Sequence, residues 1–263
     1  MKAVSEPQII ALITDFGTRD YFVGAMKGVI LSINRSANVI DITHEIAPQN
    51  ITSAGFTLRA CYREFPPQTI FVAVVDPGVG SERRSILVET EKYYFLAPDN
   101  GLLGFIFDET EQFRVFELTE EKYFRRPVSR TFHGRDIFAA CAAHLSVGVK
   151  PNQFGSEITD FVRPGENFPR AANENEIAAQ IIHIDRFGNL VTNLKRTDLP
   201  EKFILQIGSN NIKNLRTFYA EAETNELFMI FGSSEFLEVV AFCNSAAKLL
   251  GVNLGDEVRV QKM

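Results

Sequence analysis

Thr69-Ile70-Phe71-Val72-Ala73-Val74-Val75, an unbroken apolar run, leads directly into Asp76-Pro77-Gly78-Val79-Gly80-Ser81-Glu82-Arg83-Arg84. Because the run does not alternate with polar residues, it predicts a strand that is buried on both faces of a parallel sheet. Asp76 then follows the carboxyl end of this strand, the edge of an open α/β sheet where ligands bind. The stretch therefore predicts a carboxylate–guanidinium pair at a sheet edge, which serves either a functional site or only the stability of a turn.

The pattern around this stretch predicts that strands and helices alternate through residues 1–165. The run 9–14 is a second short apolar strand, and it also ends at an aspartate, Asp15. Apolar residues then recur at helical spacing, and the same alternation continues to an alanine-rich helix at 136–147. The sequence therefore predicts an N-terminal, mainly parallel α/β sandwich domain over residues 1–165.

The pattern changes after this domain. Residues 166–176 are polar, contain a proline and have no apolar period, so they are predicted to be a linker. Short runs with strand character fill residues 177–263, with one brief helix at 245–250, and predict a small, mostly-β, barrel-like C-terminal domain. The expected strands are 177–184, 190–194, 202–207, 227–230, 236–241 and 257–261.

Composition excludes several classes of protein. A net charge of -6 and an isoelectric point near 5.4 leave no basic field, so nucleic acid is not expected as a partner. The N-terminus has no signal-peptide pattern, and no apolar run reaches the ~18 residues that a membrane span requires. The three cysteines, Cys61, Cys141 and Cys243, are expected to be free thiols, the last two buried, in a reducing compartment. These features predict a cytoplasmic protein without a membrane partner.

Two further segments carry chemistry. Phe132-His133-Gly134-Arg135-Asp136 sets an imidazole just before a helix, as a hydrogen-bonding group or as a structural residue. The turn Asp185-Arg186-Phe187-Gly188-Asn189 could bind an amine, stack a ring and read a heterocycle edge, or could simply close a hairpin. The other histidines, including His44, are interpreted as structural. No spacing typical of metal ligands, of a phosphate-binding P-loop or of a serine nucleophile is present, so no metal is expected.

Seven ordered motifs together resemble the S-adenosylmethionine (SAM) hydroxide adenosyltransferase family, the adenosine-forming SAM hydrolases related to the fluorinase and chlorinase enzymes. The family's fold, an α/β domain followed by a small β-barrel-like domain, matches the architecture predicted above. The resemblance implies a homotrimer whose active sites lie between subunits, a small-molecule substrate and no cofactor. The motifs are Leu12–Gly17, Asp41–His44, Asp76–Gly80, Ala97–Gly101, Thr131–Asp136, Asp185–Asn189 and Leu237–Ala247.

The resemblance also implies roles for individual residues. The catalytic group falls on Asp76, Arg83 and His133, and Asp15 would hold the ribose hydroxyls. In the C-terminal part, Asp185 would take the methionine ammonium. The remaining substrate-binding residues implied are Ser233 or Ser234 near the methionine carboxylate, Phe187, Asn189 and Ser245 around the adenine, and Glu238.

Departures from the halogenases favour water or hydroxide as the nucleophile. The halogenases carry Tyr where this chain has Asp76, and a small hydroxyl residue where it has Gly134. A carboxylate repels an incoming halide, whereas it can orient a water molecule or accept its proton. The sequence therefore predicts hydrolysis of SAM to adenosine and methionine, with a SAM-dependent halogenase and a non-catalytic SAM or adenosine binding protein as the alternatives.

Overall fold

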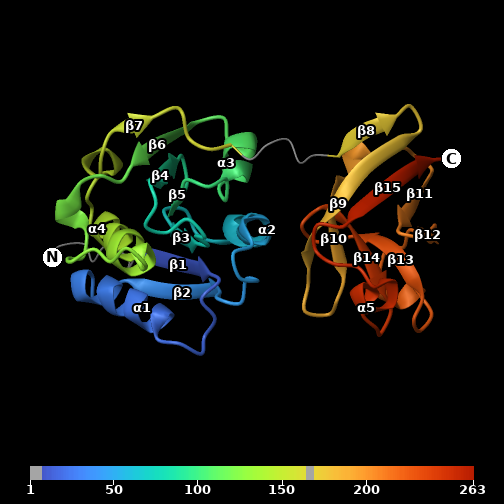
Figure 1. Cartoon of the computed structure of the whole chain (residues 1–263), viewed down its shortest axis with the longest axis horizontal. Coiled ribbons are helices and arrows are strands. Elements are labelled where there is room, and N and C mark those ends of the chain that lie inside the picture. The colour runs from blue at the N-terminus through green and yellow to red at the C-terminus, as the bar shows by residue number, and fades with distance from the viewer. Residues whose placement is uncertain (1–7, 164–168) are drawn as a thin grey trace. The chain divides into compact units, whose positions relative to one another are not determined.

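The computed structural model describes residues 8–163 and 169–263, and it divides the chain into two compact units, Met1–Gly165 and Glu166–Met263 (Figure 1). The first residues of the predicted linker, 166–168, lie outside the described residues. Its residues 170–173 do not form a linker but strand β8, Arg170–Asn173, which pairs antiparallel with β9 of the C-terminal unit. All four residues of β8 are exposed, so this strand lacks the apolar alternation by which a sequence reveals a strand.

The N-terminal unit is built on a seven-stranded sheet in the order β2-β1-β3-β5-β4-β6-β7. The first four strands in this order run parallel, and β4, β6 and β7 are antiparallel to their neighbours. The prediction of a mainly parallel α/β domain is therefore confirmed. The strands are β1 (Ile9–Thr14), β2 (Asn38–Thr43), β3 (Ile70–Val74), β4 (Ser85–Thr90), β5 (Tyr94–Pro98), β6 (Phe113–Glu117) and β7 (Glu157–Ile158).

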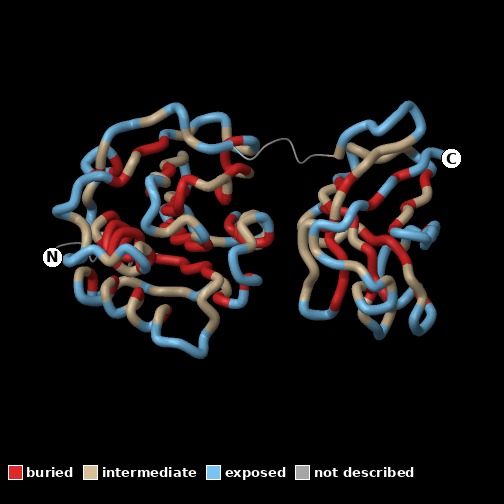
Figure 2. Tube along the Cα trace, in the orientation of Figure 1, coloured by how far each residue is buried: buried red, intermediate tan, exposed pale blue. Residues whose placement is uncertain are grey.

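Helices cover both faces of this sheet. Alternate residues of β3 pack into two different cores: Val72 lies in the core shared with α1 and α4, and Phe71 in the core shared with α2 and α3. Figure 2 shows the buried residues concentrated along the central strands and in α4. The unbroken apolar runs of β1 and β3 thus reflect burial on both faces, as predicted. The helices are α1 (Phe22–Ile33), α2 (Ile51–Cys61), α3 (Gly104–Glu109), a π-helical turn (Gly134–Ala139) and α4 (Ala140–Ser146).

The C-terminal unit is an eight-stranded antiparallel sheet in the order β12-β11-β15-β9-β10-β14-β13, with β8 beside β9. Its two end strands, β12 and β13, contact each other, so the sheet curls into a nearly closed barrel around its own apolar core. This confirms the barrel-like prediction. The elements are β9 (Glu176–Ile184), β10 (Leu190–Lys195), β11 (Phe203–Ile207), β12 (Asn210–Ile212), β13 (Leu227–Phe231), β14 (Phe236–Ala241), α5 (Ala246–Leu250) and β15 (Glu257–Lys262).

The three thiols lie in different environments. Cys141 is buried and Cys61 is half-buried, and burial raises the pKa of Cys61 to about 11. Cys243 is exposed, which corrects the prediction of a buried thiol. The apolar residues before it end β14, and Cys243 itself lies in the following turn with a positive φ of 57°. None of the helices in the described residues is long and apolar enough to cross a membrane.

Candidate active site

Asp76 and Arg83 flank a tight turn at the carboxyl edge of the sheet. The turn closes through two backbone hydrogen bonds, from the Val79 N–H to the Asp76 carbonyl (3.3 Å) and from the Ser81 N–H to the Gly78 carbonyl (3.1 Å). Asp76 follows β3 closely, and Arg83 comes just before β4. The chain therefore returns to the sheet edge with the guanidinium beside the carboxylate, as the spacing predicts.

Arg83 joins Asp76 to His133 in one hydrogen-bonded group. Its Nε donates to Asp76 Oδ1 at 3.0 Å and its Nη2 to Asp76 Oδ2, which is a bidentate pair. The same Nη2 lies 2.8 Å from His133 Nδ1, and Nη1 donates to Ser85 Oγ at 2.7 Å. The side chains of Asp76 and Arg83 are only 5% and 11% exposed, so this pair is held largely out of water.

The contact with Arg83 fixes the protonation of His133. A guanidinium has no acceptor, so Nδ1 must accept this hydrogen bond and the ring carries its proton on Nε2. Burial lowers the pKa of His133, and the positive charge of Arg83 lowers it further. His133 is therefore neutral at pH 7, with Nε2–H as its remaining donor.

The surroundings of the group hold it in place. The Arg83 guanidinium stacks over the Phe138 ring, 5.5 Å from its centroid. Asp136, which is fully buried, accepts hydrogen bonds from Arg125, Arg135 and the Ser129 N–H, and so anchors the loop that leads to His133. The sequence predictions missed Phe138 and Ser85 as partners of Arg83, because neither residue carries a signal beyond burial.

Arg84 belongs to a different ion pair. It binds Asp99 through Nε (3.0 Å) and Nη2 (2.9 Å), and Asp160 through Nη1 (2.7 Å). Asp99 also accepts from the Val162 N–H at 2.8 Å. The two consecutive arginines thus point to separate partners, and Arg84 ties the end of the N-terminal unit to the sheet.

Gly80 gives the turn before Arg83 its shape. Its φ is +78°, and a Cβ at this position would lie 2.2 Å from the Arg130 carbonyl oxygen. We expect Gly80→Ala to lower the free energy of unfolding by about 2 kcal/mol or more, because a left-handed backbone and a backbone clash add together. Gly28→Ala in α1 is the matched control: the space around Gly28 is open, and we expect a gain of up to about 1 kcal/mol. Denaturant unfolding measures both, and equal stability of the two variants would contradict this prediction.

Asp15 lies at the same edge of the sheet. It directly follows β1, and β1 pairs in parallel with β3 so that Thr14 lies opposite Val74. Its Oδ2 accepts a hydrogen bond from the Gln49 N–H at 2.8 Å. The two strand-end carboxylates predicted from the sequence therefore follow neighbouring strands.

In the C-terminal unit, Asp185 caps its own turn. Its Oδ1 accepts from the N–H groups of Phe187 (2.9 Å) and Asn189 (2.8 Å), and its Oδ2 accepts from Asn189 Nδ2 (2.8 Å). Asn189 is buried, whereas the Phe187 ring is 76% exposed. Asp185 therefore closes the hairpin, which is one of the two roles that the sequence left open. The exposed Phe187 ring is accessible to another contact.

Ser245 lies against this turn. A Cβ at Gly188 would come within 2.0 Å of Ser245 Oγ, and the Ala247 N–H donates to the Gly188 carbonyl at 3.0 Å. Ser245 Oγ also accepts from the Lys248 N–H and caps α5. The structure therefore brings together the two segments that the sequence predicts around a heterocycle.

Glu238, on β14, and the two serines lie near the β13–β14 turn. Ser233 is exposed and Ser234 is half-buried within this turn. A Cβ at the preceding Gly232 would fall 1.8 Å from Glu238 Oε1, so the carboxyl group fills the space beside the turn. Burial, together with the charge of Asp185, raises the pKa of Glu238 to about 7. The negative charge of Asp185 therefore acts on the carboxyl group of Glu238 within this unit.

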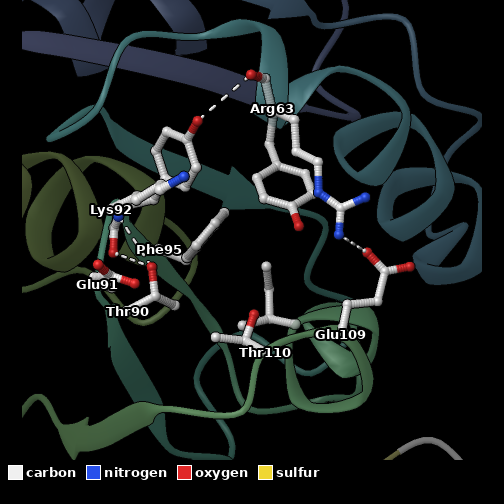
Figure 3. A pocket seen from close by; sticks show the side chains of 10 residues that line it. Arg63, Thr90, Glu91, Lys92, Phe95, Glu109 and Thr110 are labelled. Carbon is white, nitrogen blue, oxygen red and sulfur yellow. Dashed lines mark hydrogen bonds and ion pairs between the residues drawn. The ribbon is translucent and has the colours of Figure 1, made fainter.

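A pocket of about 280 Å³ lies elsewhere on the N-terminal unit (Figure 3). It is lined by residues at the start of β5 and around the β4–β5 turn, the edge opposite to Asp76, and by Arg63 and Glu109, which pair at 2.9 Å. None of the predicted site residues lines it. Among the described residues, no three His, Cys, Asp or Glu side chains gather in a way that could hold a metal ion.

The fold and the site together define a class of protein. Its members have a parallel α/β unit with an Asp–Arg–His group at the sheet edge, followed by an antiparallel β barrel. Residues 10–155 match the SAM hydroxide adenosyltransferase N-terminal domain, and residues 179–259 match the C-terminal domain of the same family. The chain therefore belongs to the SAM hydroxide adenosyltransferase family.

Individual relatives agree with this membership. The chain is 38% identical to the (R)-S-adenosyl-L-methionine hydrolase of Methanocaldococcus jannaschii over 96% of this chain and 95% of the relative. It is 29% identical to a fluorinase of an Actinoplanes species over 73% of this chain and 74% of that protein. The crystal structure of an uncharacterized conserved protein from Thermotoga maritima has a TM-score of 0.88 and 33% identity, and the match covers 96% of this chain and 100% of that one. The similarity to the hydrolase thus extends further along the chain than the similarity to the fluorinase.

Proposed function

We propose that this protein hydrolyses S-adenosyl-L-methionine to adenosine and L-methionine. The observation that carries the proposal is the bidentate Asp76–Arg83 pair with His133 on the same guanidinium, at a sheet edge that suits a ligand. The relatives that match nearly the whole chain are named as hydrolases of this substrate. A carboxylate at the reaction centre favours water over a halide as the nucleophile.

In this reaction the main task of the protein is to supply and align the nucleophile. A water oxygen forms a bond to C5′ while the C5′–S bond breaks, and the electron pair of that bond returns to sulfur as neutral methionine leaves. The water gives up one proton, which Asp76 accepts or passes to solvent. Such proton transfer typically contributes about 10²–10⁴-fold, and alignment in a water-poor pocket supplies much of the remainder.

Each member of the group has a role in this step. Asp76 orients the water, because its oxygens keep lone pairs beyond those that Arg83 uses. Arg83 fixes the orientation of this carboxylate and stabilises hydroxide character as it develops. His133, neutral and with its proton on Nε2, is a donor beside the same centre.

We propose that the remaining residues bind the substrate. Asp15 takes the ribose hydroxyls, Asp185 the methionine ammonium with Glu238 beside it, and Ser233 or Ser234 the carboxylate. Phe187, Asn189 and Ser245 surround the adenine, which the exposed ring of Phe187 supports. Since these residues belong to both units, we further propose a homotrimer in which the C-terminal unit of one subunit completes the site of the next. The reaction requires no metal or redox cofactor, and we place the protein in the cytoplasm.

The direct test is incubation of the purified protein with each sulfonium epimer of SAM, with and without chloride or fluoride. Adenosine and methionine from the R epimer, at the same rate with and without halide, are the expected products, since the relatives' name specifies R. Chromatography with mass spectrometry identifies them. A 5′-halo-5′-deoxyadenosine would instead establish a halogenase, and unconsumed SAM with bound adenosine would establish a binding protein.

The pH dependence of the reaction reports on His133. Its lowered pKa keeps it neutral at pH 7, so we expect kcat/KM to stay level as the pH falls from 7 and to decline only as the ring protonates, below the ordinary histidine pKa of about 6.5. The same shift makes stability rise with pH between the lowered folded pKa and the unfolded value of about 6.5, because the unfolded chain binds the proton more readily. His133→Asn keeps an acceptor in place of Nδ1 and cannot titrate. An acidic limb that persists unchanged in this variant would contradict the role of His133.

A further inference from the structure

His44 is a buried histidine that makes hydrogen bonds to one residue before Asp15 and to one residue after it. It is only 3% exposed, and its Nδ1 lies 2.9 Å from Thr14 Oγ1, on the residue before Asp15. Its backbone carbonyl accepts from the Gly17 N–H at 2.7 Å, two residues after Asp15. The loop after β2 thereby holds the end of β1 by one side-chain and one main-chain hydrogen bond.

Thr14 and His44 each make a further contact beyond the one that joins them. Thr14 Oγ1, on a residue with no exposed surface, accepts from the Phe16 N–H at 3.2 Å and shares a second hydrogen bond, of 2.9 Å, with His44 Nδ1. His44 Nε2 lies 3.0 Å from Asp41 Oδ1, in an electrostatic contact that is off the line of a regular hydrogen bond. Asp41 is in turn paired with Lys27 at 2.6 Å.

The far end of this chain of contacts reaches the segment of His133. Phe16, whose N–H bonds to Thr14, packs its ring against Phe132 with centroids 5.8 Å apart. A Cβ at Gly134 would lie 3.3 Å from the Phe16 ring, so the ring also fits closely against the residue after His133. Any shift of the Thr14–Phe16 backbone would therefore move both Asp15 and the support of His133.

We propose that Asp41, His44 and Thr14 form a positioning relay that fixes the backbone of Asp15 and Phe16, and thereby sets the ribose-binding carboxylate relative to the Asp76–Arg83–His133 group. The proposal rests on the function given above, which assigns the ribose to Asp15. None of the three relay residues is a catalytic residue. Thr14 and His44 are buried, and they act on the reaction only through the loop they hold.

The test is a comparison of two nucleosides, adenosine and 2′,3′-dideoxyadenosine, whose binding to the full chain is measured by titration calorimetry. Wild type is expected to prefer adenosine by at least about tenfold, because hydroxyls that bond to a carboxylate contribute strongly. Thr14→Val keeps the branched shape but loses the hydroxyl, and we expect its preference to fall below about threefold. Thr14→Ser is expected to restore most of the preference. Thr18→Val removes an exposed hydroxyl of the same loop and is expected to leave it unchanged.

A second variant covers the case in which Thr14→Val does not fold. Asp41 is partly exposed, so Asp41→Ala is expected to fold and to show an intermediate preference, with KM for SAM raised more than kcat is lowered. If wild-type preference persists in both variants, or both nucleosides weaken equally, the relay is overturned while the proposed function stands. If wild type itself shows no preference or does not hydrolyse SAM, the ribose assignment or the function fails, and the relay falls with it.

Discussion

Replacing Asp76 by alanine is expected to reduce SAM turnover by more than about a thousandfold while adenosine still binds within about threefold of wild type. The carboxylate is the group proposed to orient water, and its loss would remove both proton acceptance and alignment. Nucleoside contacts are assigned to other residues, so binding should survive. Single-turnover kinetics and nucleoside titration give the two numbers separately.

Asp160→Ala is the matched control for this variant. Asp160 is also a carboxylate bound to an arginine, but its partner is Arg84 and its side chain is 77% exposed. We expect activity close to wild type, because an exposed ion pair contributes little. If Asp76→Ala retained wild-type turnover, the assignment of the nucleophile-orienting group would be wrong.

Arg83→Lys is expected to lower kcat by about a hundredfold or more, although the positive charge is kept. The guanidinium reaches Asp76, His133 and Ser85 at once, and a single ammonium cannot reproduce this forked geometry. Arg83→Ala should reach the loss expected for Asp76→Ala, because the largely buried carboxylate is then left without its partner. Steady-state kinetics on both variants, with a melting curve for each, separates lost chemistry from lost folding.

The neighbouring residue supplies the control. Arg84→Lys makes the same chemical change one position along the chain, at a side chain that binds Asp99 and Asp160 instead. We expect this variant to keep its activity and to lose only stability. Equal kinetic losses at both arginines would show that the turn as a whole, and not the guanidinium of Arg83, supports catalysis.

The central strands and the Asp76–Arg83 pair could be predicted because their signals are local. An apolar run without alternation reports burial on both faces, as the two cores on either side of β3 show. A short turn between Asp76 and Arg83 leaves few ways for the chain to return, so proximity follows from spacing. The barrel strands were equally clear where one face is buried.

Other parts depend on contacts that local patterns do not encode. His133 meets Arg83 fifty residues along the chain, through the packing of a π-helical turn against the sheet. Spacing also could not show that Arg83 and Arg84 bind different carboxylates. β8 was missed because an exposed edge strand has no apolar face, and Cys243 was misplaced because a turn interrupts its apolar surroundings.

Because the three thiols differ in exposure, this molecule is well suited to labelling with a fluorescent dye at a single position. The chain contains no tryptophan, so its own emission is weak and leaves the spectrum open to an added dye. Cys243 is exposed, whereas Cys141 is buried and the thiolate of Cys61 is scarce at neutral pH. A maleimide dye would therefore attach at one position, two residues from Ser245. Under the proposed placement of the adenine beside Ser245, light emitted there would report in real time when a nucleoside enters and leaves.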